Sequence, residues 1–500
     1  MIVPRYGIFE ETFDWNSAGC HNPWQQVHVT ITLTPPTKQR ITVGGFYYGP
    51  NTWKARFAPD EIGKWSWQAV LTDGAQTARF AGTFQVVKSD WPGFVRQNPN
   101  NKFRWVFDDG SPFYPLGIGD CMQDLDKSGS PIDNWGLDGD FRPPTPDEGR
   151  LVDIDTYWKA YSEAGVNLFR WSVDNCAFGL YRSIEPGGNV YLRDEGIAGD
   201  ELVQKLRQYG ARTYMVIFGF EPPFPQNTTR EQFDAINHYV KYVVDRYGAY
   251  VDFWELMNEA TVSDDWYHEV ASYLRSIDPY KHPISTSWEK PELDAIEINS
   301  PHWYQKENEF DSDEVTWQKF EQWKRAGKPV IVGEQGNSGQ NFDERSGLRM
   351  RLRAWTTFFA EGALIFWNNS FAKDYKAGAA NIYLGPEERG YLKVLQDFTR
   401  GFDARAQITT LQVSNPNLVR GYALSSPTTY ATYLHAYTDH ANPTTGISVT
   451  LESPAAGTAT WIEPATGRVL GSQAIAAGTQ VLTVPPFTID IALKITTANA

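Results

Sequence analysis

Cysteine is scarce in this chain, with Cys20, Cys121 and Cys176 as the only three among 500 residues. They lie far apart and show no C-x-x-C spacing, which argues against a disulfide framework or a zinc site and favours a reducing compartment. Long hydrophobic runs are also missing, because no stretch of about 18 apolar residues occurs that could span a membrane. The opening residues, MIVPRYGIFEETF, lack the basic segment followed by an apolar one that marks a secretory signal. We therefore expect a cytoplasmic location, or a secreted one if a leader has been removed.

Positive charge is in the minority, with 45 basic against 60 acidic residues and a net charge of -15. This balance argues against a nucleic acid or an anionic membrane surface as partner. Hydrophobic residues make up 41% and charged residues 21% of the chain, as is typical of a globular protein. The length exceeds what one ordinary core holds, so we expect two or three domains.

Aromatic residues are abundant, with 19 Trp, 25 Tyr and 28 Phe. Large hydrophobic cores account for most of them in any interpretation. Aromatic faces also stack on the apolar C–H faces of sugar rings, so a carbohydrate ligand is a second interpretation. Composition alone leaves both open.

The pattern of the chain changes twice. Residues 1–92 show short alternating runs such as VHVTITL and FQVV, which predict an N-terminal β-sandwich. Residues 93–402 alternate strand and helix patterns, which predict parallel βα units. Residues 403–500 return to short β runs between Gly, Pro and Thr turns, which predict a C-terminal β-sandwich without an evident titratable cluster.

The N-terminal segment carries a short motif, Arg56–Pro59 followed by Gly63–Trp65. It resembles a small sandwich domain that often precedes sugar-cleaving barrels. A purely structural domain is the favoured interpretation. Trp53 and Trp67 are the candidates for a carbohydrate-binding surface if it has one.

Eight buried strand patterns occur in the middle segment and predict a (β/α)8 TIM barrel, a fold that typically needs about 250 residues. The predicted strands are 113–119, 166–171, 212–220, 251–257, 282–288, 295–304, 329–335 and 363–369, with helical stretches such as 230–248 and 351–362 between them. In this fold the active site forms at the carboxyl ends of the strands. Side chains at those ends are therefore the candidates for function.

Two glutamates stand at such ends. The fourth strand ends in Asn258-Glu259 and the seventh in Glu334. Cleavage of a glycosidic bond needs two carboxyl groups, one to protonate the leaving oxygen and one to attack the sugar or activate water. Glu255, four residues before Glu259, should lie deeper and needs a cationic partner such as Arg170.

With these residues in strand order, the barrel resembles clan A of the retaining (β/α)8 glycosidases, which includes family 5 and family 39. The resemblance implies Glu259 as acid/base, Glu334 as nucleophile, and a retaining mechanism. It also implies the supporting residues Arg170 on the second strand, Asn258 on the fourth, His302 and Tyr304 on the sixth, and Trp367 on the eighth. Many relatives have Asn-Glu-Pro where this chain has Ala260, so the family within the clan stays open.

The roles implied by the resemblance have physical consequences. Burial and the nearby Glu334 charge should raise the pKa of Glu259. Arg170 and Tyr304 should stabilise ionised Glu334. Asn258 should hydrogen-bond the sugar 2-hydroxyl, a contact that strengthens in the transition state. Trp367 should form an apolar floor under the sugar, and His302 should orient the network or hold a hydroxyl.

Other strand ends supply weaker candidates for sugar contacts. Asp120 and Trp288 are expected to support substrate binding, whereas Asp174, Asn175 and Glu221 have an even chance of only shaping loops.

The loop 121–150 is acidic, and Asp124–Gly129 resembles the start of a calcium loop. Its twelfth position is Trp135 and not the bidentate Glu that such loops require. We expect a substrate-shaping loop there, with no metal and no cofactor in the reaction.

The sequence therefore predicts a retaining glycosidase that cleaves β-linked oligo- or polysaccharides. A transglycosylase would use the same two glutamates, and a non-catalytic carbohydrate-binding protein could keep the barrel. Sugar identity, linkage, endo or exo action and oligomeric state stay open.

Overall fold

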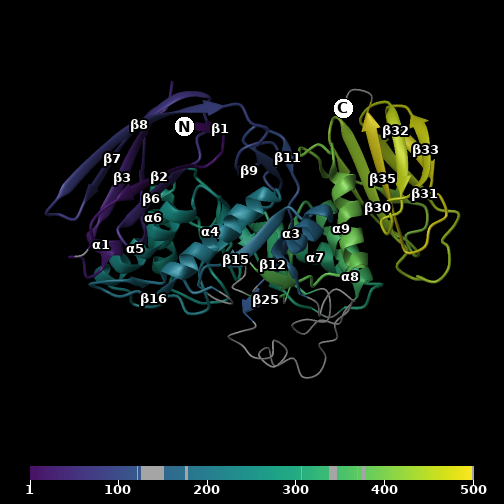
Figure 1. Cartoon of the computed structure of the whole chain (residues 1–500). Helices are drawn as coiled ribbons and strands as arrows, with labels where there is room; N and C mark the ends of the chain where they lie inside the picture. The colour runs from purple at the N-terminus through teal and green to yellow at the C-terminus, as the bar shows by residue number, and fades with distance from the viewer. Residues whose placement is uncertain are drawn as a thin grey trace.

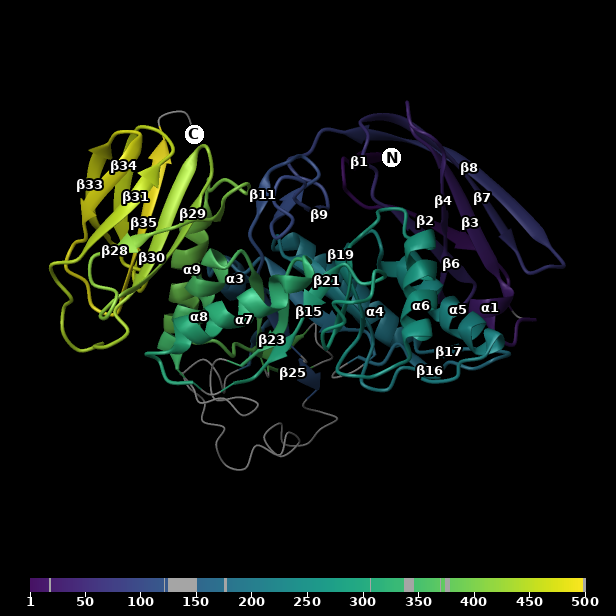
Figure 2. The same ribbon diagram turned by 180° about the vertical axis from the view of Figure 1, so that it is seen from behind.

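The structure, a computed structural model, describes residues 1–17, 19–120, 122–124, 151–174, 178–305, 307–336, 346–368, 370–373 and 378–497. A central barrel lies between two sets of β-sheets (Figure 1). The N-terminal strands, in purple, cover one side of the barrel, and the C-terminal strands, in yellow, lie beside helices α8 and α9; the view from behind shows the same order (Figure 2). Within these described ranges no helix is long and apolar enough to cross a membrane.

The N-terminal strands form two sheets around one core. One sheet has the order β1-β8-β7-β3-β4 and the other β2-β6-β5. The elements are β1 (Ile2–Pro4), β2 (Phe9–Asp14), α1 (Pro23–Gln26), β3 (His28–Thr34), β4 (Ile41–Gly44), β5 (Phe46–Gly49), β6 (Thr52–Phe57), β7 (Gly63–Thr72) and β8 (Thr77–Val87). Trp53 and Trp67 are 1% and 8% exposed inside that core, so their suggested role as a sugar-binding surface is wrong.

Arg56 of the Arg56–Pro59 motif lies at the interface between the N-terminal sheets and the barrel. Arg56 is buried, and its guanidinium donates to Asp200 of the barrel helix α4 at 2.6 Å. Arg246 of helix α5 donates to the same carboxylate at 2.7 Å. The pairing lets three charged groups lie buried between the sheets and the barrel, since each charge has a partner.

The barrel is a closed sheet of parallel strands in the order β21-β20-β19-β18-β15-β12-β24-β23-β22. Its strands are β12 (Leu116–Asp120), β15 (Leu168–Ser172), β18 (Arg212–Phe218), β19 (Val251–Met257), β20 (Ile284–Ser287), β21 (Ile298–Ser300), β22 (His302–Trp303), β23 (Ile331–Gln335) and β24 (Ala363–Asn368). The predicted sixth strand is split in two at Pro301, which cannot donate to a ladder. A parallel bridge between Asn299 and Val330 joins β21 to the start of β23 and so closes the ring.

Helices follow most of the barrel strands. They are α3 (Ile154–Glu163), α4 (Arg193–Gln208), α5 (Arg230–Tyr247), α6 (Asp264–Ile277), α7 (Ser312–Trp323), α8 (Gly347–Phe359) and α9 (Pro386–Thr399), with a 3-10 turn at Lys324–Ala326. The connection 288–297 between β20 and β21 is described throughout and contains no helix. This connection is short and contains Pro291, which disfavours a helix, so the expected helix between the fifth and sixth strands is absent.

The amino-terminal end of the barrel is filled by a small sheet. It consists of β9 (Val95–Gln97), β10 (Trp105–Phe107) and β11 (Pro112–Phe113). Val95, Trp105 and Phe113 share one core with residues that point into the barrel, including Leu168 and Tyr214. This plug leaves the carboxyl ends of the strands as the open mouth.

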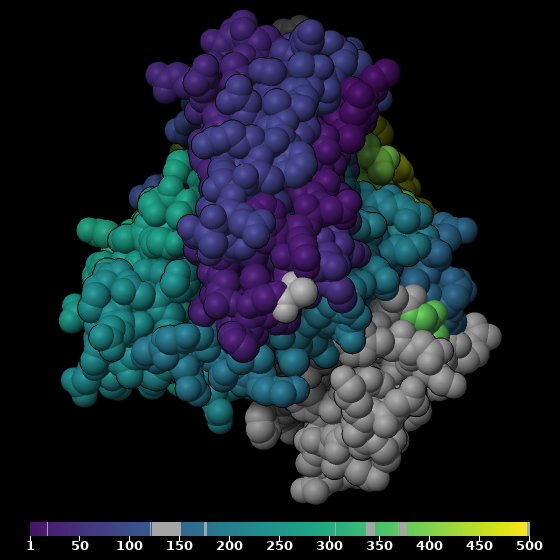
Figure 3. Space-filling view, turned by 60° about the vertical axis from the view of Figure 1, so that its left-hand side comes forward, coloured from purple at the N-terminus to yellow at the C-terminus, as the bar shows by residue number. Residues whose placement is uncertain are grey.

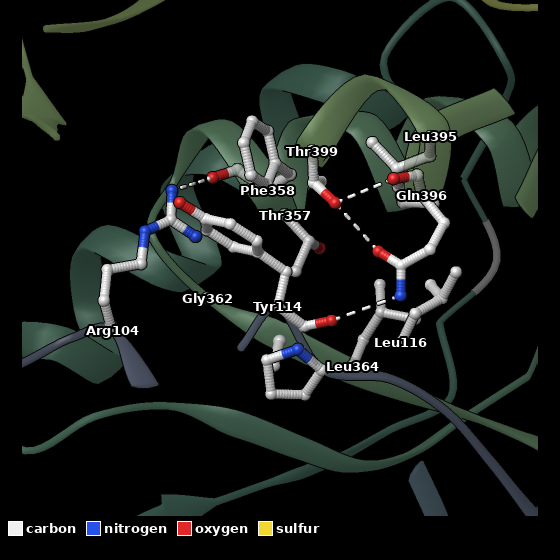
Figure 4. A pocket seen from close by; sticks show the side chains of 13 residues that line it. Arg104, Tyr114, Leu116, Thr357, Phe358, Gly362, Leu364, Leu395, Gln396 and Thr399 are labelled. Carbon is white, nitrogen blue, oxygen red and sulfur yellow. Dashed lines mark hydrogen bonds between the residues drawn. The ribbon is translucent and has the colours of Figure 1, made fainter. Parts of the chain in front are cut away.

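A cavity near the same end is too small for a ligand. It lies between Tyr114, Phe358 and Leu395, where Arg104 donates to the Phe358 carbonyl (Figure 4). Its volume is about 20 Å³. That space is enough for about one water molecule.

Short strands extend some loops. They are β13 (Gln123–Asp124), β14 (Leu151–Asp153), β25 (Phe371–Lys373) and β26 (Ala379–Asn381), which pair in one sheet, and β16 (Tyr181–Ser183) with β17 (Val190–Tyr191). The rest of the acidic loop, including the calcium-like segment after Asp124, lies outside the described residues, as does Asn175.

The C-terminal strands form two sheets, ordered β27-β29-β30-β35-β32-β33 and β28-β31-β34, around a second core. The strands are β27 (Gln407–Ile408), β28 (Gln412–Val413), β29 (Arg420–Ser425), β30 (Thr429–His435), β31 (Ser448–Ser453), β32 (Gly457–Ile462), β33 (Val469–Ile475), β34 (Gly478–Thr483) and β35 (Asp490–Thr497). Arg351 of α8 forms a buried ion pair with Asp490 at 2.9 Å, which ties these sheets to the barrel. The domain boundaries after residues 92 and 402 stay predictions.

Candidate active site

The two strand-end glutamates lie together at the barrel mouth. Glu334 is within β23, and Glu259 is two residues past the end of β19. One carboxylate oxygen of each and a ring nitrogen of His302 all lie within 4.8 Å of one another. The barrel thus brings together three titratable groups that are far apart in the sequence.

Glu334 is held by two donors. Arg170 Nη1 donates to Oε1 at 2.7 Å, and the Tyr304 hydroxyl donates to Oε2 at 2.5 Å. The side chain of Glu334 is only 7% exposed. Both oxygens of this carboxylate are therefore fixed, and its negative charge is stabilised by a cation and a hydroxyl.

Arg170 is the centre of the polar network. Its Nε and Nη2 each donate to Glu255 at 2.7 Å, and Nη2 also donates to Asn258 Oδ1 at 2.8 Å. Burial opposes its charge, but Glu255 and Glu334 outweigh burial and raise the pKa of the guanidinium above its usual value. The sequence predicts that Glu255 is buried and needs a cationic partner, and in the structure Arg170 is that partner.

Asn258 is oriented by the same contact. Its amide oxygen accepts from Arg170, so its amide N–H group is left as the donor toward a ligand. The backbone of Asn258 donates to the Phe218 carbonyl at 3.1 Å, which ties the end of β19 to β18.

Glu259 is positioned by an unusual backbone. Its φ is 48°, in the left-handed region that residues with a side chain rarely adopt. Its backbone N–H donates to Ser287 Oγ at 2.6 Å, and that hydroxyl donates to the Met257 carbonyl at 2.8 Å. Ser287 thus holds the turn that aims Glu259 into the mouth. The sequence interpretation missed Ser287, although its place at the end of β20 was the available signal.

The Glu259 carboxylate is hydrogen-bonded to His302. His302 Nδ1 lies 2.8 Å from Glu259 Oε1 and 3.5 Å from Glu334 Oε2. The hydrogen bond from His302 lowers the pKa of Glu259, and this outweighs the effect of burial. The expected rise in the pKa of Glu259 is therefore wrong for the free protein, because Glu259 has its own donor and Arg170 neutralises Glu334.

Close packing under the site depends on two glycines. A side chain at Gly333 would lie 2.7 Å from Ser300 Oγ and 3.1 Å from His302 Nε2. A side chain at Gly119 would lie 2.7 Å from the ring of Trp367. The missing side chains let His302 and Trp367 lie close to the strand backbone. Trp367 also lies with its ring centre 5.8 Å from the Arg170 guanidinium.

The two remaining predicted residues lie outside this network. Asp120 is buried and accepts from the Tyr157 hydroxyl at 2.7 Å and from the backbone of Met122 and Ser370. It joins the ends of β12 and β24. Trp288 directly follows β20 with a φ of 60° and is 52% exposed. Their contact with a substrate stays a prediction.

Asp174 is a further acid at the carboxyl end of β15. Its carboxylate accepts from the Tyr181 hydroxyl at 2.6 Å and from the Gly219 backbone at 2.9 Å. Burial raises its pKa to about 6. These protein contacts fit the loop-shaping role that the sequence left open.

Comparisons with known proteins agree with the fold. Residues 2–72 match the model of a family described as a domain of unknown function (DUF5060). No curated protein sequence matches the chain. The chain is similar to the crystal structure of a provisionally assigned glycoside hydrolase from Bacteroides vulgatus, with a TM-score of 0.69, 17% identity and 99% of each chain covered.

A second solved structure, a family 5 glycoside hydrolase from Bacteroides vulgatus, is similar with a TM-score of 0.54 and 13% identity, covering 82% of this chain and 94% of the other. At such low identity the likeness shows a shared fold.

Proposed function

We propose that this protein is a retaining glycoside hydrolase that cleaves β-linked oligo- or polysaccharides, with Glu334 as nucleophile and Glu259 as acid/base. The observation that carries the proposal is that one oxygen of the Glu259 carboxylate lies within 4.8 Å of an oxygen of the Glu334 carboxylate. Retaining enzymes hold their carboxyl groups about 5–5.5 Å apart, whereas inverting enzymes need about 6.5–9.5 Å to admit a water. The solved relatives described as glycoside hydrolases add support.

The surroundings of the two glutamates support different roles for them. Glu334 is buried and fixed by Arg170 and Tyr304, which suits a carboxylate that must stay ionised and attack one point. The side chain of Glu259 is 31% exposed, which suits a group that protonates a leaving sugar and later deprotonates water. Asn258 would donate to the sugar 2-hydroxyl, and Trp367 would face the ring.

In the first step Glu334 attacks the anomeric carbon, and Glu259 gives its proton to the departing oxygen. In the second step Glu259 removes a proton from water, which attacks the anomeric carbon and releases Glu334. Two inversions leave the sugar with its original configuration. A transglycosylase would differ only in replacing water by a sugar hydroxyl.

The leaving group would lie beside Glu259, between the ends of β18 and β20. Both ends carry an exposed aromatic side chain, Phe220 at 50% and Trp288 at 52% exposure. Exposed rings on either side of an acid/base offer stacking faces for further sugar units. This arrangement favours a leaving group that is itself a sugar chain.

The proposal is tested with a panel of aryl β-glycosides together with xylan, mixed-linkage β-glucan and galactomannan. We expect turnover of at least one substrate, and proton NMR should show the first-formed sugar with the anomeric configuration of the substrate. Dialysis against EDTA should leave the rate unchanged, because the two-carboxylate mechanism supplies acid and nucleophile without a Lewis acid. An inverted first product would overturn the retaining mechanism.

The alternative functions are tested separately. Sizing of products in the presence of a sugar acceptor separates hydrolysis from transfer, and binding without turnover would indicate a non-catalytic protein.

The pH profile depends on His302. Because the His302 hydrogen bond lowers the pKa of Glu259, its removal should raise that pKa and keep the acid form to higher pH. We expect His302→Ala to move the alkaline limb of kcat/KM upward, since that limb reports the acid of the free enzyme. His302→Asn, which keeps a neutral donor near the position of Nδ1, should lie between the two. A limb that stays in place or moves downward in His302→Ala would show that another group controls it.

A further inference from the structure

A second hollow lies on the outer wall of the barrel, away from the two glutamates. It is about 350 Å³ in volume and lies where α1, β3 and β5 of the N-terminal sheets meet helix α5. Aromatic side chains form much of its wall, namely Trp24, Phe46, Tyr47, Tyr191, Tyr242 and Tyr273. An adjoining open hollow of about 760 Å³ shares Gln25, His28 and His238 with it, so the two form one junction groove. The N-terminal segment that overlies the barrel is seen from its own side in Figure 3.

Beside the groove, the N-terminal sheets are in close contact with the barrel. A side chain at Gly44 would lie 2.1 Å from atoms of Lys241 and Asp245, so the end of β4 rests directly on helix α5. Next to this contact, Trp24 and Tyr47 meet edge to face with ring centres 4.7 Å apart. Both rings are half-buried, so part of their surface stays open to the groove. The two parts of the protein are thus fixed at a distance that leaves aromatic faces uncovered.

Polar groups along the groove have spare hydrogen-bonding capacity. Within the part of the chain that the structure describes, the side chains of Gln25, His28 and His238 make no hydrogen bond, and all three line both hollows. Trp24 Nε1 is buried and also lacks a partner there. Burial and the neighbouring His28 lower the pKa of His238, so this ring is neutral at pH 7 and can both donate and accept.

Charge along the groove points to a neutral ligand. Lys241 is already paired with Asp245, and the acids Glu185, Glu231 and Asp234 line the open side. Among the described lining residues an anionic ligand would meet three carboxylates and no unpaired lysine or arginine, and a purely apolar ligand would leave the amide and imidazoles unsatisfied. A sugar fits both the aromatic and the polar side chains of the groove, because its C–H faces stack on aromatic rings and its hydroxyls both donate and accept hydrogen bonds.

We propose that the junction groove is a non-catalytic binding site for a neutral saccharide chain, with Trp24 and Tyr47 as stacking faces and Gln25, His28 and His238 as hydrogen-bonding groups. The site does not depend on the hydrolase proposal, because binding there needs neither glutamate. It replaces the buried Trp53 and Trp67 as the sugar-binding surface of the N-terminal segment. A polysaccharide held there would keep the protein on its substrate while the barrel mouth works.

Affinity electrophoresis tests the site. The Glu334→Gln variant is run in native gels that contain xylan, mixed-linkage β-glucan or galactomannan, and the same gels carry Trp24→Ala, Gln25→Ala and His238→Ala in that background. We expect at least one polysaccharide to retard the parent and Trp24→Ala to weaken retardation about tenfold, equivalent to roughly 1.4 kcal/mol of stacking. The variants Gln25→Ala and His238→Ala should weaken it several-fold without disturbing the fold, because neither side chain makes a hydrogen bond within the described part of the chain. Phe80→Ala, an exposed ring elsewhere on the same sheets, is the matched control and should have no effect.

Turnover of a small aryl glycoside by each groove variant, made with Glu334 intact, separates this proposal from the hydrolase proposal. We expect it to be unchanged, because a small substrate reaches only the barrel mouth. Retardation of the parent that no groove variant weakens, or no retardation in any gel, would overturn the groove as a binding site, whatever the aryl glycoside assay gives. Equal losses of aryl glycoside turnover and retardation in all three variants would also overturn it, since they would indicate a structural role.

Discussion

Replacing Glu334 by Gln is expected to lower kcat on a natural polysaccharide by at least about 10⁴-fold, since an amide cannot form the covalent intermediate. The fold should survive. The amide oxygen can still accept from Arg170, and its N–H can face the Tyr304 hydroxyl, which rotates to accept. Circular dichroism and the thermal midpoint of unfolding check the fold. Glu289→Gln is the matched control, because Glu289 follows β20 but accepts from the Trp323 indole and should be dispensable for turnover.

Glu259→Gln gives the complementary result. Loss of the general acid should cost about 10²–10⁴-fold on substrates with poor leaving groups and much less on activated aryl glycosides. Added azide should rescue both variants with opposite products: a glycosyl azide of inverted configuration from Glu334→Gln and of retained configuration from Glu259→Gln. The reverse pairing of products would exchange the two roles. Near-native turnover of a poor-leaving-group substrate by either variant would remove that glutamate from the mechanism.

Much of the barrel is readable from the sequence because its strands are short, buried and separated by amphipathic helices. All eight predicted strand ranges overlap a barrel strand, although the sixth is broken at Pro301. The rule that carboxyl ends of strands form one mouth was enough to select Glu259 and Glu334, and the structure places them together. Their chemical roles stay predictions until activity is measured.

Features that depend on distant partners were out of reach. The expected rise in the pKa of Glu259 rests on burial and on the nearby Glu334 charge, and only the three-dimensional structure shows His302 at 2.8 Å. A helix between the fifth and sixth strands is expected because a regular (β/α)8 barrel has one after each strand. The connection 288–297, which contains Pro291, has no helix. The junction groove arises where the N-terminal sheets pack against helix α5, which no local pattern encodes.

One error was avoidable from the sequence. Strand β7 alternates buried and exposed side chains, and Trp67 shares its inward face with Trp65, Ala69 and Leu71. A period-2 count places an aromatic that follows this apolar register in the core. Trp24, in contrast, opens a single helical turn after Pro23 and belongs to no strand register, so its partly open position could not be inferred.

Arg170→Met should have the largest effect on stability together with loss of turnover. Glu255 is fully buried and receives two hydrogen bonds from Arg170. Removal of the guanidinium leaves that carboxylate without its cation, which typically costs about 3–5 kcal/mol. Glu334 loses a donor at the same time, so its reactive orientation is lost. Urea unfolding measures the first effect, and kcat on the best substrate measures the second.

Two further variants separate charge from geometry. Arg170→Lys keeps a cation but cannot pair with Glu255 through two parallel bonds while also reaching Glu334 and Asn258, so we expect intermediate stability and a large loss of kcat. In Arg170→Met/Glu255→Gln the buried charge of Glu255 is removed together with its cation, and part of the lost stability should return through coupling of the two sites. Turnover should stay low in the double variant, because Glu334 still lacks its Arg170 donor. Recovery of both stability and turnover would mean that Arg170 serves only to neutralise Glu255, whereas recovery of neither would mean that packing, and not charge, dominates at this position.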